Sequence, residues 1–348
     1  MTKIEKFNEL FQVPPAMRRY IELVVEPGEI DLVLAMNGET LDASEVGDRL
    51  GLASQAAEEL LLRAYRRHVV SKVVDGKTVN YVFDYVEEKE RRVRFAPARF
   101  YDRLDPVTTQ ENWGDIPEEV RKEISQWWLD GYIEKVGPVI EQIKKNPDAY
   151  YQIKQRDFLL LEEALEQVDA ADFHVVLNCD CRSAEQACSH MRETCIRFDD
   201  GARYTIERGL GRVVSKAECK EIVINTDRDG LMHIGSKNRG ESRLFGLCNC
   251  CSCCCFPLRA AARLHSDKKY PRTHFVAQRN LDDCSHCGLC IKRCRFKAFR
   301  RVPEKIEIAG KMRRRVIFDA ESCRGCGLCA TACPDSAIEM KPLANAQT

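Results

Sequence analysis

Eight cysteines near the C-terminus form two runs that share one spacing. The first run consists of Cys284, Cys287, Cys290 and Cys294. The second run consists of Cys323, Cys326, Cys329 and Cys333, with Pro334 directly after it. Three thiolates on a tight loop can bind three irons of one cubane, while the fourth cysteine leads into a helix that points away. The doubled spacing therefore predicts two 4Fe-4S clusters and an electron carrier.

The two runs are expected to exchange their last cysteines, because each fourth thiolate serves the other cluster. One ligand set is then Cys284, Cys287, Cys290 and Cys333. The other set is Cys323, Cys326, Cys329 and Cys294. Zinc also binds Cys-x2-Cys pairs, but a zinc site closes with four ligands from two such pairs and does not need this doubled pattern.

Ten further cysteines lie upstream and form a second candidate metal region. They are Cys179, Cys181, Cys188, Cys195, Cys248, Cys250, Cys251, Cys253, Cys254 and Cys255. A packing role does not explain so many cysteines close together, because exposed thiolates oxidise. Metal binding explains them better. Adjacent cysteines on one loop are expected to point apart, which favours a division between two sites or a larger cluster. We predict a third iron–sulfur cluster of unknown type, with the 250–255 run completing it or holding a further one.

Composition and charge limit the classes of partner. The chain has 348 residues and a formal net charge of zero, so no global basic excess suits nucleic acid or an anionic membrane. No window approaches the roughly 18 consecutive apolar residues of a membrane span, and no signal-peptide pattern is apparent. We expect a cytoplasmic protein without membrane insertion. No glycine-rich phosphate loop is apparent either, so no nucleotide cofactor is expected and electrons should arrive from redox protein partners.

Residues 1–90 are expected to form a winged-helix-like module. One helix opens at Leu41–Glu45 and ends at Gly51, and Ser54 is expected to cap a second helix. Strands at 69–74 and 79–83 flank an Asp75-Gly76 turn, which is a strong hairpin signal. Helix, turn, helix and hairpin in this order resemble a winged-helix domain.

Such a module would bind DNA through its second helix and its wing. The phosphate contacts would come from Arg63, Arg66, Arg67 and Lys77. Glu58 and Glu59 on the same helix argue against this role, and winged helices also serve as protein-docking modules. Duplex DNA is therefore the less favoured partner.

Three further regions complete an expected α+β multidomain architecture. Residues 91–170 should form an aromatic-rich helical linker, with an amphipathic helix beginning near Glu118. Residues 171–270 should form a cysteine-rich α/β domain, and residues 271–348 a two-cluster ferredoxin domain. Within the last region, strands at 305–308 and 315–318 should form a hairpin studded with Arg313, Arg314 and Arg315. This basic face would attract an acidic redox partner.

The C-terminal motifs resemble the bacterial-type two-cluster ferredoxin domain. One departure is that the first run ends in Cys294-Arg295 where the second ends in Cys333-Pro334. A Cys-x-Cys-Arg segment from Cys179, the cysteine run at 250–255 and the ferredoxin tail together resemble a family of prokaryotic 4Fe-4S dicluster proteins. This resemblance spans about 159–348 and implies a soluble redox protein without specifying a substrate.

We therefore expect a protein that passes single electrons between protein partners and needs no acid–base machinery. Three alternatives stay open. The cysteine-rich domain could make the chain a reductase or activator component of an anaerobic enzyme system. Cluster oxidation could alter DNA binding, as in a redox-sensing winged-helix transcription regulator. The same domain could handle metal or sulfur for cluster assembly.

Overall fold

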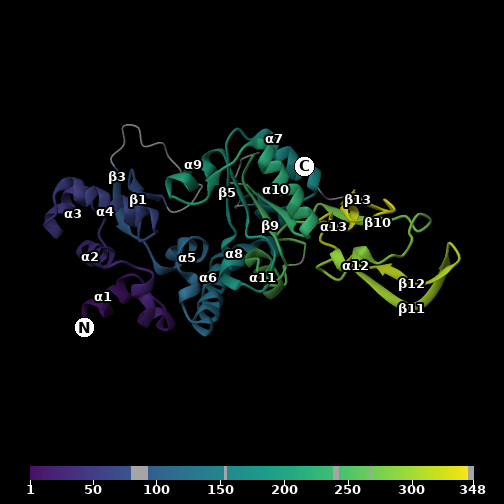
Figure 1. Cartoon of the computed structure of the whole chain (residues 1–348), viewed down its shortest axis with the longest axis horizontal. Coiled ribbons are helices and arrows are strands. Elements are labelled where there is room, and N and C mark those ends of the chain that lie inside the picture. Colours follow the sequence, from purple (N-terminus) through teal and green to yellow (C-terminus); the bar gives the residue numbers. More distant parts are fainter. Residues whose placement is uncertain (80–92, 153–154, 238–242, 267, 344–348) are drawn as a thin grey trace.

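The computed structural model describes residues 1–79, 93–152, 155–237, 243–266 and 268–343. The molecule is elongated, with the N-terminal helices at one end and the C-terminal strands at the other (Figure 1). A six-stranded sheet lies between these ends. Helix and strand are mixed along the whole chain, as expected for an α+β protein.

The N-terminal region combines helices with a small antiparallel sheet. Its helices are α1 (Lys3–Leu10), η1 (Pro15–Leu23), α2 (Pro27–Met36), α3 (Ala43–Leu50) and α4 (Ser54–Arg66). Its strands are β1 (Val70–Val74), β2 (Lys77–Val79) and β3 (Val93–Pro97), in the order β2-β1-β3. The expected second hairpin strand at 79–83 lies largely outside the described residues. The winged-helix assignment stays a prediction.

Local signals define most of these helix ends. The Asp42 side chain accepts a hydrogen bond from the Glu45 N–H at the start of α3, and Gly51 ends this helix with a φ of 66°. The expectation that Ser54 caps α4 is wrong, because Ala53 occupies the cap position and Ser54 is the first helical residue. The Ala53 side chain makes no capping hydrogen bond.

The region from 91 to 170 is only partly helical. It contains α5 (Phe100–Thr109), η3 (Trp113–Asp115), α6 (Glu118–Lys145), η4 (Pro147–Gln152), β4 (Gln155–Leu159) and α7 (Leu161–Ala170). The predicted helix at Glu118 is confirmed and continues past Pro138. Two strands in this interval belong to sheets on either side, because β3 pairs with β1 and β4 pairs with β8 (Met232–Lys237).

The central sheet has the order β4-β8-β9-β6-β5-β7, and all its pairings are antiparallel. Its remaining strands are β5 (His174–Asn178), β6 (Glu193–Phe198), β7 (Arg212–Val213) and β9 (Leu244–Cys250). The associated helices are α8 (Asp180–Glu185), α9 (Asp199–Glu207), α10 (Lys216–Asp229) and α11 (Phe256–Arg263). Helices α7 and α10 pack on one face through a core that includes Ile196 and Leu247. Because side chains alternate along a strand, the neighbouring Cys195 and Cys248 belong to the opposite face.

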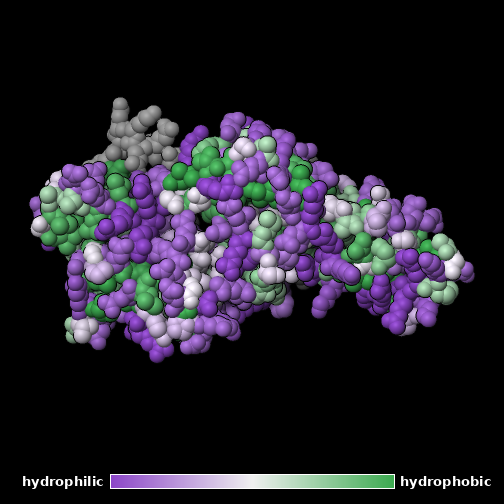
Figure 2. All heavy atoms as spheres, in the orientation of Figure 1, coloured by the Kyte–Doolittle hydropathy of each residue, from purple (hydrophilic) through white to green (hydrophobic). Residues whose placement is uncertain are grey.

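The C-terminal lobe consists of short elements around two cysteine loops. It contains β10 (Phe275–Arg279), α12 (Leu289–Arg293), β11 (Phe299–Ile308), β12 (Lys311–Phe318), α13 (Leu328–Thr331) and β13 (Ile338–Pro342). Strand β10 pairs with β13, and β11 pairs with β12 in the predicted hairpin. Hydrophilic residues cover most of the visible face of the molecule (Figure 2). Among the described residues, no helix is both long and apolar enough to cross a membrane.

Candidate metal centres

The outer cysteine set of the C-terminal lobe surrounds one small cavity. Its members are Cys284, Cys287, Cys290 and Cys333. The cavity measures about 20 Å³ and is closed by apolar side chains that include Val316 and Ile338. Burial, with the charges of Cys284 and Cys287, raises the pKa of Cys290 to about 11. The structure thus brings Cys333 of the second run to three cysteines of the first.

The inner cysteine set combines Cys294 with three cysteines of the second run, Cys323, Cys326 and Cys329. Burial raises the pKa of Cys326 to about 12, and the neighbouring Cys294 and Cys323 thiolates contribute to this shift. The Gly325 N–H lies 3.4 Å from the Cys323 sulfur, and the Ala298 N–H lies 3.3 Å from the Cys294 sulfur. Four soft thiols fit an iron–sulfur cluster in each set, and the inner set has these amide donors in addition.

Gly325 lies where the inner loop passes close to strand β10. Its φ is 64°, and a Cβ atom at this position would lie 2.2 Å from the Phe275 carbonyl oxygen. Only glycine combines this left-handed backbone with so close an approach. The loop can therefore take this position only because Gly325 has no Cβ atom.

Eight upstream cysteines line a much larger cavity of about 270 Å³ in the middle of the molecule. Six of them, which we call the cavity cysteines, are Cys179, Cys181, Cys195, Cys248, Cys250 and Cys255, and the other two are Cys251 and Cys254. They come from the end of β5, the start of α8, strands β6 and β9, and the start of α11. The sulfurs of Cys250 and Cys255 are 3.3 Å apart. Six soft thiols around one hollow fit an iron–sulfur centre better than a hard cation.

Three arginines place positive charge around these thiols. Burial lowers the pKa of Arg182, but the charges of Cys179 and Cys251 outweigh it and raise this pKa overall. The same balance raises the pKa of Arg197 beside Cys248 and Cys195. An Nη1 atom of Arg156 lies 4.0 Å from the Cys248 sulfur. The cavity is therefore suited to a negatively charged centre.

Another part of the lining comes from α5, α6 and α11 and is largely aromatic. Tyr101 of α5 and Trp128 and Tyr132 of α6 line the cavity together with Phe256. The Trp128 and Phe256 rings are 5.3 Å apart and nearly perpendicular, an edge-to-face arrangement that favours tight packing. A Cβ atom at Gly131 would lie 2.7 Å from the Tyr101 ring, so glycine makes room for this ring.

Ionisable groups accompany the aromatic wall. Loss of water, with the charges of Asp105 and Cys179, raises the pKa of Asp180 to about 7. His68 also lines the cavity, and burial holds its pKa well below the usual value. Its Nδ1 is 3.0 Å from the Asp102 carbonyl oxygen. Its buried Nε2 has no hydrogen-bond partner among the described residues.

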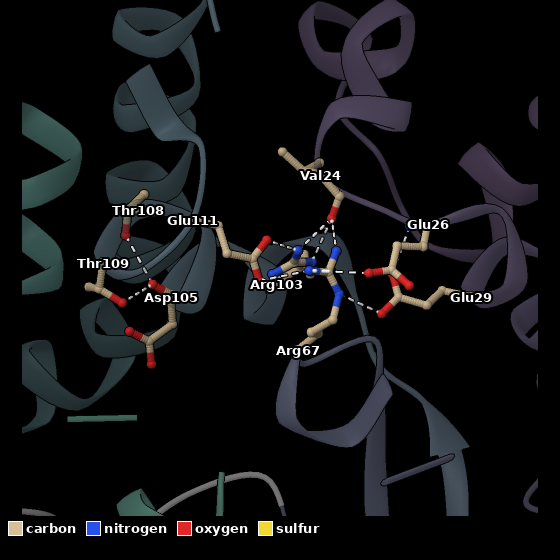
Figure 3. A network of polar contacts seen from close by, with 9 residues as sticks. All are labelled: Val24, Glu26, Glu29, Arg67, Arg103, Asp105, Thr108, Thr109 and Glu111. Atoms are coloured by element: carbon tan, nitrogen blue, oxygen red, sulfur yellow. Dashed lines mark hydrogen bonds and ion pairs between the residues drawn. The ribbon is translucent and has the colours of Figure 1, made fainter. Parts of the chain in front are cut away.

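A buried polar network, shown in Figure 3, fixes helix α5, which carries Tyr101 of this wall. The Arg103 side chain is fully buried and donates through Nε to the Val24 carbonyl oxygen at 2.9 Å. Arg103 also forms an ion pair with Glu111. Arg67 binds the same Glu111 at 3.2 Å and Glu29 at 2.7 Å. The network joins α2, α4 and α5, so the N-terminal helices hold the cavity wall in place.

Cys251 and Cys254 also belong to a second group of four cysteines, which we call the cysteine quartet. Its members are Cys188, Cys251, Cys253 and Cys254. All four sulfurs lie within 4.8 Å of one another. The 250–255 run is thus divided between two groups, but the expectation that adjacent cysteines point apart is wrong for Cys253 and Cys254, whose sulfurs are 3.8 Å apart. The tight turn after β9 brings this pair together.

Three other side chains of metal-binding type, on Cys219, His233 and His190, have contacts that give them structural roles. The buried Cys219 packs in the core between α10 and the sheet, away from both upstream groups. His233 is buried and its Nδ1 lies 2.6 Å from the Asn249 amide oxygen. His190 pairs with Asp229 at 2.8 Å. The sequence did not indicate that aromatic side chains line the cavity. Arg182 in the Cys-x-Cys-Arg segment did indicate positive charge beside the cavity cysteines.

The C-terminal lobe packs directly against the cavity region. Leu328 and Cys326 of the inner loop share one apolar cluster with Cys250 and Cys255. The cluster is completed by Phe158, Met232, Ile234, Leu258, Cys248 and Phe296. The Thr331 hydroxyl contacts Asp227 at 3.4 Å at the edge of this interface. The inner set therefore faces the cavity cysteines across packed side chains.

These observations define the class of the C-terminal lobe as a ferredoxin-type iron–sulfur domain. Residues 283–338 match the family described as "4Fe-4S dicluster domain". A 61-residue stretch is 38% identical to the pyruvate synthase subunit PorD of Thermotoga maritima, covering 18% of this chain and 52% of that subunit. The chain thus spans about half the length of this curated relative. No solved structure matches the chain. An iron–sulfur electron-transfer role follows for the C-terminal domain.

Proposed function

We propose that this chain receives single electrons from a protein partner at its ferredoxin domain and passes them to a further iron–sulfur centre at the cavity cysteines. The apolar cluster that contains both Cys326 and the Cys250–Cys255 pair carries this proposal. It supports the proposal because cysteines proposed as ligands of both centres pack in one cluster. The cavity would then be the place of reduction, which makes the chain a reductase or activator component of a cytoplasmic redox system.

The outer cysteine set would be the entry point for electrons. Arg301, Arg313 and Arg314 line a hollow of about 320 Å³ together with Cys287. Arg301 also donates to the Cys287 carbonyl oxygen at 2.8 Å. Positive charge beside the outer set favours encounter with an acidic redox protein, which the surface would orient toward Cys287. The relative PorD is named as a pyruvate synthase subunit, which supports a place for such a domain among redox protein partners.

The cavity residues suit an acceptor that gains negative charge. Arg156, Arg182 and Arg197 would offset the charge of thiolate ligands and of an added electron. The aromatic wall limits water, which strengthens these electrostatic interactions. Iron–sulfur centres supply one-electron redox chemistry when bound. His68 and Asp180 are the nearby groups that could hold a proton as charge accumulates.

Metal analysis of the anaerobically purified full chain tests the proposal. Two cubanes account for about eight irons per chain, so about twelve or more are expected. The double variant Cys179→Ser/Cys181→Ser should lose the additional iron and its electron paramagnetic resonance signal while keeping the ferredoxin signals. Cys219→Ser is the matched control and should keep every signal. About eight irons in the wild-type chain, unchanged in the double variant, would refute a centre in the cavity.

The transcription-regulator alternative has weaker support. Arg67, one of its expected phosphate contacts, is paired with Glu29 and Glu111 inside the N-terminal region. Arg63 lies 3.5 Å from Glu26. Salt-dependent binding to duplex DNA that changes with redox state would favour the regulator, and its absence in both states would remove this alternative.

A further inference from the structure

The cysteine quartet brings four sulfur atoms together, all within 4.8 Å of one another. Cys188 lies 3.8 Å from Cys251 and 3.7 Å from Cys254. Cys253 lies 3.8 Å from Cys254. A zinc ion with bonds of about 2.3 Å to four thiolates sets sulfur–sulfur edges of about 3.8 Å in a regular tetrahedron. The three sulfur pairs already have this separation.

The same spacing argues against a cubane in the quartet. Each thiolate of a 4Fe-4S cluster binds a different iron, so the ligand sulfurs lie on separate corners and farther apart than four sulfurs that share one ion. Cys188 and Cys253 are absent from the lining of the large cavity, whereas Cys251 and Cys254 line it beside the cavity cysteines. The quartet therefore adjoins the cavity and extends outside it.

We infer that Cys188, Cys251, Cys253 and Cys254 bind one zinc ion, which has a structural role distinct from electron transfer. Four thiols would release up to four protons on binding, leaving a tetrathiolate with two net negative charges. Arg182 is placed to offset part of this charge, because the Cys251 and Cys179 thiolates both act on its guanidinium. Arg182 is itself held by the Asn249 carbonyl oxygen at 2.8 Å.

The ion would brace the turn that carries two cavity cysteines. Cys251, Cys253 and Cys254 lie between Cys250 and Cys255 in the sequence, and the Cys255 N–H contacts the Cys251 carbonyl oxygen at 3.3 Å. Linking this turn to Cys188 would fix both ends of the turn beside the cavity. A redox-inert ion suits this role, because its geometry does not change as electrons pass nearby.

Zinc analysis of the full chain tests this inference separately from any iron count. We expect one zinc per chain and a zinc-edge X-ray absorption spectrum with four sulfur neighbours at about 2.3 Å. Cys253→Ser changes the exposed member of the quartet, so it should lower zinc retention at least tenfold in the presence of a chelator. Cys219→Ser should match the wild type.

Three results on the wild-type chain would overturn the inference. They are less than a tenth of a zinc per chain after growth with zinc, zinc bound through nitrogen or oxygen, and iron in place of zinc in the quartet. Loss of iron from Cys253→Ser with zinc retained would also overturn it, by assigning the quartet to the cavity centre. A chain with only eight irons but one sulfur-bound zinc would refute the proposed function and leave this inference intact.

Discussion

Substitution of Gly325 by alanine should remove the inner cluster while leaving the outer one. The left-handed backbone alone costs about 1 kcal/mol for a residue with a Cβ atom. The steric part is larger, because the new Cβ atom would lie 2.2 Å from the Phe275 oxygen and must move about 1.2 Å to reach ordinary contact. Strand β10 cannot yield freely, since Phe275 is paired with Pro342 of β13. The cysteine loop must therefore move.

Gly310 supplies the matched control within the same domain. Its φ is 72°, but a Cβ atom there would meet nothing within 4 Å. Gly310→Ala should thus show only the backbone cost and keep full iron content. Gly325→Ala should lose about four irons per chain, measured with acid-labile sulfide on anaerobically purified protein, while the far-ultraviolet circular dichroism is retained. Wild-type iron content in Gly325→Ala, with the thermal stability of Gly310→Ala, would refute the steric argument.

Three further predictions concern the N-terminal network, pH and partner docking. Arg103→Met should destabilise the chain by about 3–5 kcal/mol in urea unfolding, because it breaks a buried ion pair. Arg63→Met, at an exposed ion pair, should lower the stability by about 1 kcal/mol or less. Equal effects of the two substitutions would contradict the burial argument. The pKa of His68 in the folded chain is well below its ordinary value of 6.5. The neutral His68 side chain therefore contributes to stability above pH 6.5. This contribution is lost as the pH falls, because the unfolded chain then takes up a proton at His68. Residue 68 has a φ of 60°, which asparagine tolerates. Between pH 7.5 and 5.5 the wild type should therefore lose about 1.4 kcal/mol more stability than His68→Asn, and parallel pH profiles would exclude this role. Arg314→Glu should slow reduction of this chain by an acidic ferredoxin about tenfold at low salt, as measured by stopped flow. Lys122→Glu on the distant helix α6 should leave this rate unchanged. Equal changes in the two rates would rule out docking at the hairpin.

The sequence predicted features that depend on neighbouring residues. The doubled cysteine spacing indicated the dicluster domain, and the Leu41–Glu45 segment indicated the start of α3. The β11–β12 hairpin followed from alternating residues around Gly310. In each case the signal and the structure lie within a few residues of one another.

The cavity could not be predicted in the same way, because its parts are distant in sequence. Tyr101 and Trp128 face Cys179 and Cys255 only because the Arg103 network and the sheet bring their elements together. The division of the 250–255 run depends on the strand end and the turn after it, which decide where each thiol points. Spacing alone therefore indicated metal binding but not which cysteines share a centre.

The apolar cluster between Cys326 and the Cys250–Cys255 pair has a consequence for redox titrations. Such packed side chains have a low dielectric constant, so negative charge added on one side strongly repels negative charge on the other side. If centres occupy both sides, reduction of the first makes reduction of the second less favourable. The two midpoint potentials would then separate on titration, and the chain would hold one electron at this junction more readily than two.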